Sequence, residues 1–269
     1  MSPVPPAHLT EVSKEVIRVC QGLPLSLEVL GSHLRCASPD INAWTECLPL
    51  LKQAGEKIFS ILRVSLNSLQ PSQKEAFLDI CCFFIGREED FVCAFVEGRY
   101  ETGTTILTAL KSQCLITVKS TIEYHWNDRR RQVRTLQVHN QLRDMGRDII
   151  QKEEKNRAWD EKASNDILKD ARTLSGLRGL SARTDMEIPG EVANYKSFPH
   201  LRFLELEEAQ KNWELNERTT IYDLFANARC DELRWLTWRL PKELPCGLCS
   251  KQLRVLLLSN SGIRELPVR

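Results

Sequence analysis

The spacing of apolar residues predicts a bundle of helices over residues 1–56. A first helix over 9–21 ends at Gly22, where a residue without a Cβ is most useful, and Pro24 then begins a second helix. The second helix is apolar on almost every side, which is typical of a buried helix. A third helix is expected over 42–53. The apolar residues that define the first two helices are Leu9, Val12, Val16, Val19, Cys20, Leu25, Leu27, Val29, Leu30 and Leu34.

The pattern over 57–150 predicts helices followed by a two-stranded hairpin, which is the winged-helix arrangement. Two helices are separated by 69–71, with Ser72 as the expected cap of the second, and a further helix is expected over 102–113. Strands are expected at 114–118 and 135–139, paired antiparallel across a long polar turn at 119–134. That turn contains the basic run Arg129, Arg130 and Arg131 and is followed by Arg134.

Residues 136–150, LQVHNQLRDMGRDII, change from alternating to helical periodicity. His139 therefore falls at a strand-to-helix junction, and Asn140 is the expected helix cap. Leu142, Met145 and the pair at 149–150 give the following helix one apolar face.

The last part of the chain changes period again. Residues 151–176 are highly charged and are expected to form a solvated linker with some helical tendency. Residues 177–269 contain LRFLEL at 201, LRWLTW at 233 and LRVLLL at 253, with LRGLSA at 177 as a weaker copy. This LxxLxL form is typical of leucine-rich repeats, whose short strands bury their leucines by stacking. The expected fold class is thus mainly α with small β: a helical bundle and a winged helix, followed by the start of an α/β leucine-rich-repeat solenoid.

Composition excludes several classes of protein. A formal net charge of +1 gives no global reason to expect nucleic acid, a membrane or an acidic partner. The longest apolar run, 77–85, contains Asp79 and is too short to span a bilayer. The start of the chain lacks a secretory signal pattern, so a cytoplasmic or nuclear location is expected.

The ten cysteines are scattered, and we expect free thiols, buried at Cys81, Cys82, Cys93 and Cys114. Cys246 and Cys249 form an unrepeated CxxC pair, so no metal site is expected. No catalytic constellation is recognisable and the chain is not expected to be an enzyme.

Three segments carry a resemblance to a known family. GLPLSLEVLGSHL at 22–34, LRVSLNSLQPSQKEAFLDICCFFIG at 62–86 and VHNQLRDMGRDII at 138–150 resemble, in the same order, motifs of plant nucleotide-binding, leucine-rich-repeat disease-resistance proteins. The sequences of the last two segments, especially FLDICCFFIG, are similar to those of the subclass with an N-terminal TIR domain. The resemblance implies that 1–56 is a partial helical subdomain of the NB-ARC switch and that 57–150 is its winged-helix subdomain.

The resemblance also implies a nucleotide role for two residues. Pro24 would contact the adenine face of ADP or ATP, and His139 would donate a hydrogen bond to the β-phosphate. A proline offers a flat surface without a donor, and an imidazole N–H offers a directed bond to an anion. Without the resemblance, the residues support a purely structural interpretation, in which Pro24 only begins a helix and His139 only ends a strand. This interpretation remains an alternative to the nucleotide roles.

The nucleotide chemistry of the family is incomplete in this chain. Phosphate and Mg²⁺ binding need a GxxxxGK loop ending in Ser or Thr, yet none of the 12 glycines is followed by lysine. We therefore expect the chain alone neither to bind ADP tightly nor to hydrolyse ATP. Val138 and Asn140 replace the methionine and aspartate of the family signature. Since that aspartate helps to hold the resting form in the family, Asn140 implies a loss of autoinhibition.

The resulting hypothesis is a fragment of an intracellular immune receptor, lacking the TIR domain and phosphate-loop subdomain, that belongs to an ADP/ATP-dependent switch in defence. Its expected partners are proteins: its own missing regions or another receptor chain, and a pathogen effector or a guarded host protein. One alternative is a truncated adaptor, decoy or pseudogene product that acts only through protein contacts. Another is a winged-helix DNA-binding protein, against which the near-neutral charge argues.

Overall fold

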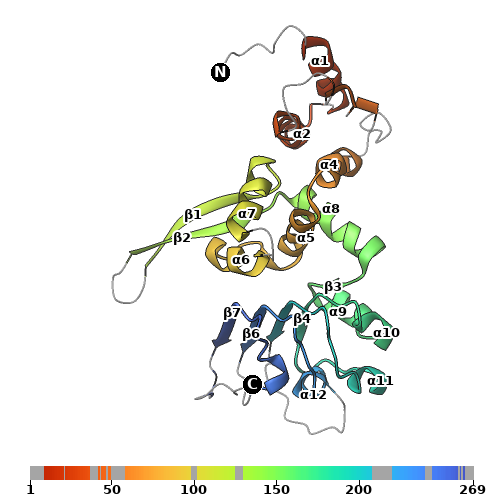
Figure 1. Cartoon of the computed structure of the whole chain (residues 1–269), viewed down its shortest axis with the longest axis vertical. Helices are drawn as coiled ribbons and strands as arrows, with labels where there is room; N and C mark the ends of the chain where they lie inside the picture. The colour runs from red at the N-terminus through yellow and green to blue at the C-terminus, as the bar shows by residue number, and fades with distance from the viewer. Residues whose placement is uncertain are drawn as a thin grey trace. The chain divides into compact units, whose positions relative to one another are not determined.

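The structure is a computed structural model of the 269-residue chain. It describes residues 9–20, 22–36, 42, 44–46, 48–49, 58–97, 102–124, 130–207, 220–239, 244–259, 261 and 263. The chain divides into two compact units, Met1–Arg147 and Asp148–Arg269 (Figure 1). Helices dominate the first unit, and a five-stranded parallel sheet dominates the second.

The first two expected helices are present. α1 (Thr10–Val19) is followed by Gly22, whose φ of +72° is a left-handed conformation that favours glycine. α2 (Pro24–Cys36) begins at Pro24, as predicted, and packs on α4 (Ile58–Asn67). The third helix expected over 42–53 lies largely outside the described residues. A small core joins the described parts of this region through Val16, Cys20, Leu30, Leu34 and Leu48.

The next helix, α5 (Pro71–Asp79), starts earlier than predicted. Gln70 is its N-cap residue, because Pro71 already has the φ of a first helical position, and Ser72 lies inside the helix. The backbone N–H of Gln70 donates to Oε1 of Gln73 at 3.3 Å. A fully buried π-helical turn, η2 (Ile80–Phe84), continues directly from α5.

Two further helices complete this core. α6 (Glu89–Val96) places Phe95 against Phe84, with ring centroids 4.7 Å apart. α7 (Gly103–Ser112) is capped by Thr102, whose hydroxyl accepts the backbone N–H of Thr105 at 3.2 Å. The described cysteines are all free, but Cys93 and Cys114 are only half-buried, so the prediction of burial was wrong for these two.

The hairpin is longer than the sequence analysis predicted. β1 (Thr117–Tyr124) and β2 (Arg130–Gln137) pair antiparallel, with Thr117 opposite Gln137 and Tyr124 opposite Arg130. The antiparallel pairing is confirmed, whereas the polar turn at 119–134 was predicted too long. Most of these strand positions face solvent, as at Ser120, Thr121 and Ile122, so they carry no alternating apolar signal.

α8 (Asn140–Ile149) follows the hairpin and has the predicted apolar face. Leu142, Met145, Ile149 and Ile150 are all at most 2% exposed. Gly146 lies against the π-helical turn, since a Cβ placed there would be 2.8 Å from Sγ of Cys81. Helix and turn are therefore in close contact.

The segment 151–176 is not a solvated linker. It contains the π-helical turn η3 (Ile150–Glu154), the strand β3 (Arg157–Ala158), and the short helices α9 (Glu161–Ile167) and α10 (Ala171–Leu174). The prediction failed because the charges lie mainly on exposed positions, while a few buried residues define the packing. Those buried residues include Ala158, Ser164, Ile167, Leu168 and Leu174.

The second unit is organised by its parallel sheet, whose strand order is β3-β4-β5-β6-β7. The strands after β3 are β4 (Gly179–Arg183), β5 (Phe203–Glu207), β6 (Trp235–Arg239) and β7 (Val255–Ser259). These are the LRGLSA, LRFLEL, LRWLTW and LRVLLL segments, so the strands expected there are confirmed. In register, Leu180 pairs with Leu204, Leu204 with Leu236 and Leu236 with Leu256.

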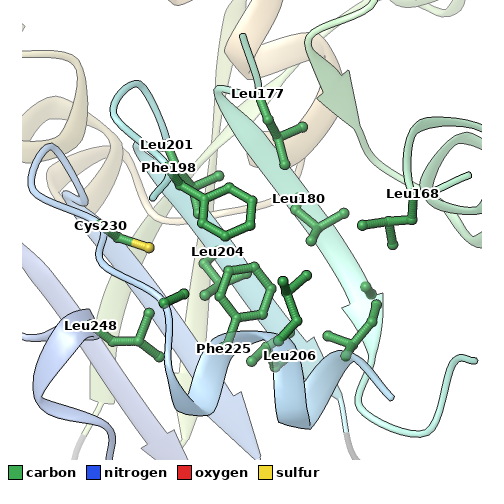
Figure 2. Packing of buried hydrophobic residues seen from close by; sticks show 14 of the residues in the cluster. Leu168, Leu177, Leu180, Phe198, Leu201, Leu204, Leu206, Phe225, Cys230 and Leu248 are labelled. Carbon is green, nitrogen blue, oxygen red and sulfur yellow. The ribbon is translucent and has the colours of Figure 1, made fainter. Parts of the chain in front are cut away.

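The core of the second unit lies between one face of the sheet and the segments that connect its strands. Those segments include α11 (Gly190–Ala193), α12 (Ile221–Ala226) and the 3-10 turn η4 (Cys246–Leu248). Figure 2 shows Leu180, Leu204 and Leu206 from the strands meeting Phe225 of α12 and Leu248 of η4. Burying these side chains is worth roughly 1.5–3 kcal/mol each. Each connection supplies residues to the same continuous core.

Candidate functional site

His139 lies between β2 and α8, at the strand-to-helix junction that the sequence predicts. Its carbonyl accepts the backbone N–H of Arg143 at 3.0 Å, which makes His139 the residue that starts the helical hydrogen bonds. Its ring Nδ1 accepts the backbone N–H of Gln141 at 3.2 Å. His139 is therefore the helix cap, a role that the sequence analysis gave to Asn140.

This capping bond fixes which ring nitrogen of His139 carries the proton. Because Nδ1 accepts a hydrogen bond, the neutral ring carries its proton on Nε2. The His139 side chain is exposed. An exposed Nε2–H at a helix start is suited to donate to an anion, and helix N-termini themselves favour negative charge.

Asn140 takes a different position from the one predicted. It is the first residue of α8, and its Oδ1 accepts a hydrogen bond from Nη1 of Arg143 at 3.2 Å. Nε of Arg143 also donates to Oδ1 of Asp144 at 2.9 Å. The junction therefore carries a guanidinium held by one amide and one carboxylate.

Pro24 lies at the first position of α2 and is exposed. Leu23, directly before it, is 36% exposed, and its carbonyl accepts the N–H of Leu27 at 3.1 Å. Together Leu23 and Pro24 present an apolar surface without a backbone donor at Pro24. A flat aromatic base is one ligand that such a surface accepts.

Pro24 and His139 belong to the same unit, but no interaction joins them within the described residues. Neither residue lines the cavity around Glu154 and His200 or the one around Glu161 and Lys169. The described structure therefore places each residue on an exposed surface. Their nucleotide roles stay predictions.

The basic residues of the hairpin are partly neutralised by acids at the start of α6. Arg131 pairs with Glu88, with 2.5 Å between Nη2 and Oε2, and Arg134 pairs with Glu89 at 2.8 Å. Lys111 reaches the other carboxylate oxygen of Glu89 at 2.8 Å. Sequence reasoning missed these acids because Glu88 is 43 residues from Arg131. The pairing argues against nucleic acid as the partner of this hairpin.

Other chemistry is limited in the described part of the chain. No group of three or more His, Cys, Asp or Glu residues gathers there as ligands of a metal ion would. Cys246 is exposed and Cys249 is half-buried, and both are free. Among the described helices, none is both long and apolar enough to cross a bilayer.

Comparison with known proteins gives the chain's relatives. The disease resistance protein RPP2B of Arabidopsis thaliana is 28% identical over 279 aligned residues, which cover 97% of this chain and 22% of the relative. The TMV resistance protein N of Nicotiana glutinosa is 29% identical over 61% of this chain and 14% of its own length. The disease resistance protein RPV1 of Vitis rotundifolia is 34% identical over 43% of this chain and 8% of its own length. No protein-family model matches the chain.

These relatives define the class of protein to which the chain is homologous. They are plant disease-resistance proteins, which confirms the resemblance drawn from the three motifs. The chain spans 22% or less of the length of these relatives.

Proposed function

We propose that this chain is part of a TIR-type plant intracellular immune receptor, acting in the cytoplasm or nucleus, and contributes to an ADP/ATP-dependent switch in defence signalling. In this proposal, residues 1–56 and 57–150 are the helical and winged-helix parts of the switch. Residues 177–269 begin a leucine-rich-repeat solenoid. The proposed partners are other regions of the receptor, a second receptor chain, and an effector or guarded host protein.

The geometry of His139 is the observation that carries the nucleotide part of this proposal. Its Nδ1 is used by the helix start, and its Nε2–H is left on an exposed surface. This arrangement supports donation to the β-phosphate of ADP, while the exposed surface of Leu23 and Pro24 supports an adenine contact. Within this proposal Asn140, in place of the family aspartate, weakens the resting state, and restoring aspartate lowers basal signalling.

The test is a pair of substitutions in the receptor expressed from its full native transcript. His139→Asn keeps a side-chain oxygen that can cap α8 but removes the Nε2–H donor. We expect this variant to retain its thermal unfolding midpoint and to lose co-purified ADP by about tenfold, since a hydrogen bond to a charged group contributes about 1.5–3 kcal/mol. His139→Ala removes both functions and is expected to lose ADP and also destabilise α8.

The opposite result is equally informative. If His139→Asn retains ADP at the level of the unaltered receptor, the histidine only caps a helix, and its proposed role at the phosphate is wrong. Chromatography of the nucleotide released on denaturation measures this retention directly.

A further inference from the structure

Two cysteines lie at the two ends of one tight turn in the second unit. The turn runs from Cys246 through Gly247 and Leu248 to Cys249, and it contains the 3-10 turn η4 between β6 and β7. Both cysteines are thiols in the structure. This pair plays no part in the nucleotide switch proposed above.

The backbone of this turn holds the two cysteines within reach of each other. The backbone N–H of Cys249 donates to the carbonyl of Cys246 at 3.2 Å, which closes the turn. A turn closed by this bond keeps its first and fourth Cα atoms less than about 7 Å apart, and disulfides span Cα separations of about 4.4–6.8 Å. Side chains three residues apart also lie on the same side of a 3-10 turn. The pair therefore meets the backbone requirement for a disulfide.

The surrounding structure fixes this turn in place. The backbone N–H of Cys230 donates to the carbonyl of Gly247 at 3.0 Å, and a Cβ added to Gly247 would lie 1.7 Å from the carbonyl oxygen of Ala228. The side chain of Leu248 is fully buried in the core of the unit (Figure 2). Because the turn is already ordered, bringing its two ends together costs little further backbone entropy.

The two thiols differ in exposure, which gives them different parts in an oxidation. Cys246 is exposed, whereas Cys249 is half-buried and packs against the core. Accessible thiols react first with a dissolved oxidant, and a redox-sensitive cysteine commonly lies beside a second cysteine that displaces the adduct. Cys246 is thus the thiol that meets the oxidant, and Cys249 is the resolving thiol.

We propose that Cys246 and Cys249 form a reversible disulfide when they meet a small disulfide oxidant such as glutathione disulfide. The thiolate of Cys246 attacks one sulfur of glutathione disulfide, which forms a mixed disulfide and releases one glutathione thiolate. The thiolate of Cys249 then attacks the Cys246 sulfur, which closes the disulfide of the turn and releases the second glutathione thiolate. Two protein thiols are oxidised, one glutathione disulfide is reduced, and the two thiol protons pass to the released glutathione molecules.

Reversibility follows from the small loop that this disulfide closes. A disulfide stabilises a chain mainly by restricting its unfolded state, and this effect falls with loop length, so a bond within a single turn gains little. Excess glutathione therefore reduces it again, as is typical of transient, redox-sensing disulfides in reducing compartments. The turn is a site that responds to oxidising conditions and not a structural cross-link. This inference does not depend on nucleotide binding.

Equilibration of the 269-residue chain with mixtures of glutathione and glutathione disulfide tests this site. Trypsin releases both cysteines in one peptide, residues 243–251. After an acid quench, mass spectrometry detects the disulfide as a loss of two hydrogen atoms and a mixed disulfide as the addition of glutathione. We expect the unaltered chain to show the disulfide peptide. Cys249→Ser should instead retain about tenfold more glutathione on Cys246, because no resolving thiol displaces it. Cys246→Ser should react little, since its remaining thiol is half-buried.

Cys230 is a control within the same chain, because its side chain is fully buried and lies in a separate tryptic peptide, residues 230–234. It should stay unmodified in the folded chain. Unfolding in urea releases the turn, so at a fixed glutathione ratio the proportion of disulfide to dithiol at Cys246 and Cys249 should fall by about tenfold.

Three results would overturn the proposal. One is that neither thiol of the turn reacts, and another is that the unaltered chain keeps glutathione on Cys246 without forming the disulfide. The third is that the urea-unfolded chain forms the disulfide as readily as the folded chain, which would show that the turn does not preorganise the pair. Circular dichroism of the two serine variants separates loss of reactivity from loss of fold.

Discussion

The left-handed backbone conformation of Lys155 lowers the stability of the folded chain through a single residue. Its φ is 47°, and its backbone N–H donates to the carbonyl of Ile150 at 2.7 Å, which closes the turn after η3. A side chain with a Cβ is disfavoured in this conformation by roughly 1–2 kcal/mol, whereas glycine adopts it readily. The turn therefore depends on its hydrogen bond rather than on the preference of lysine.

Replacing Lys155 by glycine should stabilise the chain. We expect Lys155→Gly to raise the free energy of unfolding by about 1 kcal/mol in urea denaturation. Lys152→Gly is the control, because Lys152 has helical neighbours and pairs with Asp148 at 2.7 Å, so this change should lower stability by about 1 kcal/mol. Equal effects of the two substitutions would contradict the explanation from backbone conformation.

The burial of His33 makes the stability of the first unit depend on pH. Burial lowers the pKa of His33 below its ordinary value of 6.5, and its Nδ1 is 3.1 Å from Oγ of Ser68. The unfolded chain therefore binds a proton that the folded chain excludes. By linkage, this contribution to stability is complete above about pH 6.5 and is lost as pH falls below that value.

The measurement is the urea midpoint between pH 5 and pH 7.5. The unaltered chain should lose stability toward pH 5, and His33→Gln should reduce that slope. A slope that is unchanged in His33→Gln would assign the pH dependence to other groups.

Individual residues could be located from the sequence better than their contacts could. The position of His139 at a junction follows from a change of hydrophobic period, which depends on neighbours in the chain. The identity of the cap does not, because His139 and Asn140 both carry acceptors and only the folded geometry selects Nδ1. The compensation of Arg131 by Glu88 depends on a contact across the fold, so no local pattern indicates it.

At the scale of elements, the contact between α8 and the π-helical turn η2 is set by a missing side chain. A Cβ at Gly146 would lie 2.8 Å from Sγ and 3.1 Å from Cβ of Cys81. In α2, by contrast, a Cβ at Gly31 would meet nothing within 4 Å. The two helices thus contain the same residue in opposite environments.

The same substitution should therefore have opposite signs at the two glycines. Gly31→Ala should stabilise the chain by up to about 1 kcal/mol through helix propensity. Gly146→Ala gains that propensity but overpacks the contact, and we expect a net loss of about 1–2 kcal/mol. Thermal and urea unfolding measure both changes. Stabilisation by Gly146→Ala would show that Cys81 moves aside at little cost, which would contradict close packing here.

Elements with an apolar face could be predicted, and elements without one could not. α8 and the LxxLxL strands follow from their buried leucines and isoleucines. The outer part of the β1–β2 hairpin is solvent-exposed and held by backbone pairing, so its residues look like a turn. Residues 151–176 look like a linker because charged side chains surround β3, although Ala158 is fully buried.

At the scale of the whole molecule, the chain is expected to lack the apparatus that holds nucleotide phosphates. No glycine is followed by lysine, so the phosphate charge has little compensation near His139. We expect calorimetry of the 269-residue chain with ADP and Mg²⁺ to show no saturable micromolar binding, and phosphate release from ATP to stay at background. Micromolar binding that is lost in His139→Asn would show that the junction holds a nucleotide without that loop.

The two-residue strand β3 determines how the parallel sheet can be extended. It occupies one edge and pairs only along Arg157 and Ala158, whereas the other strands have five residues each. An edge this short offers few unpaired N–H and C=O groups to another chain, which protects it from edge-to-edge aggregation. A further strand would therefore find five residues to pair with along β7 and only two along β3.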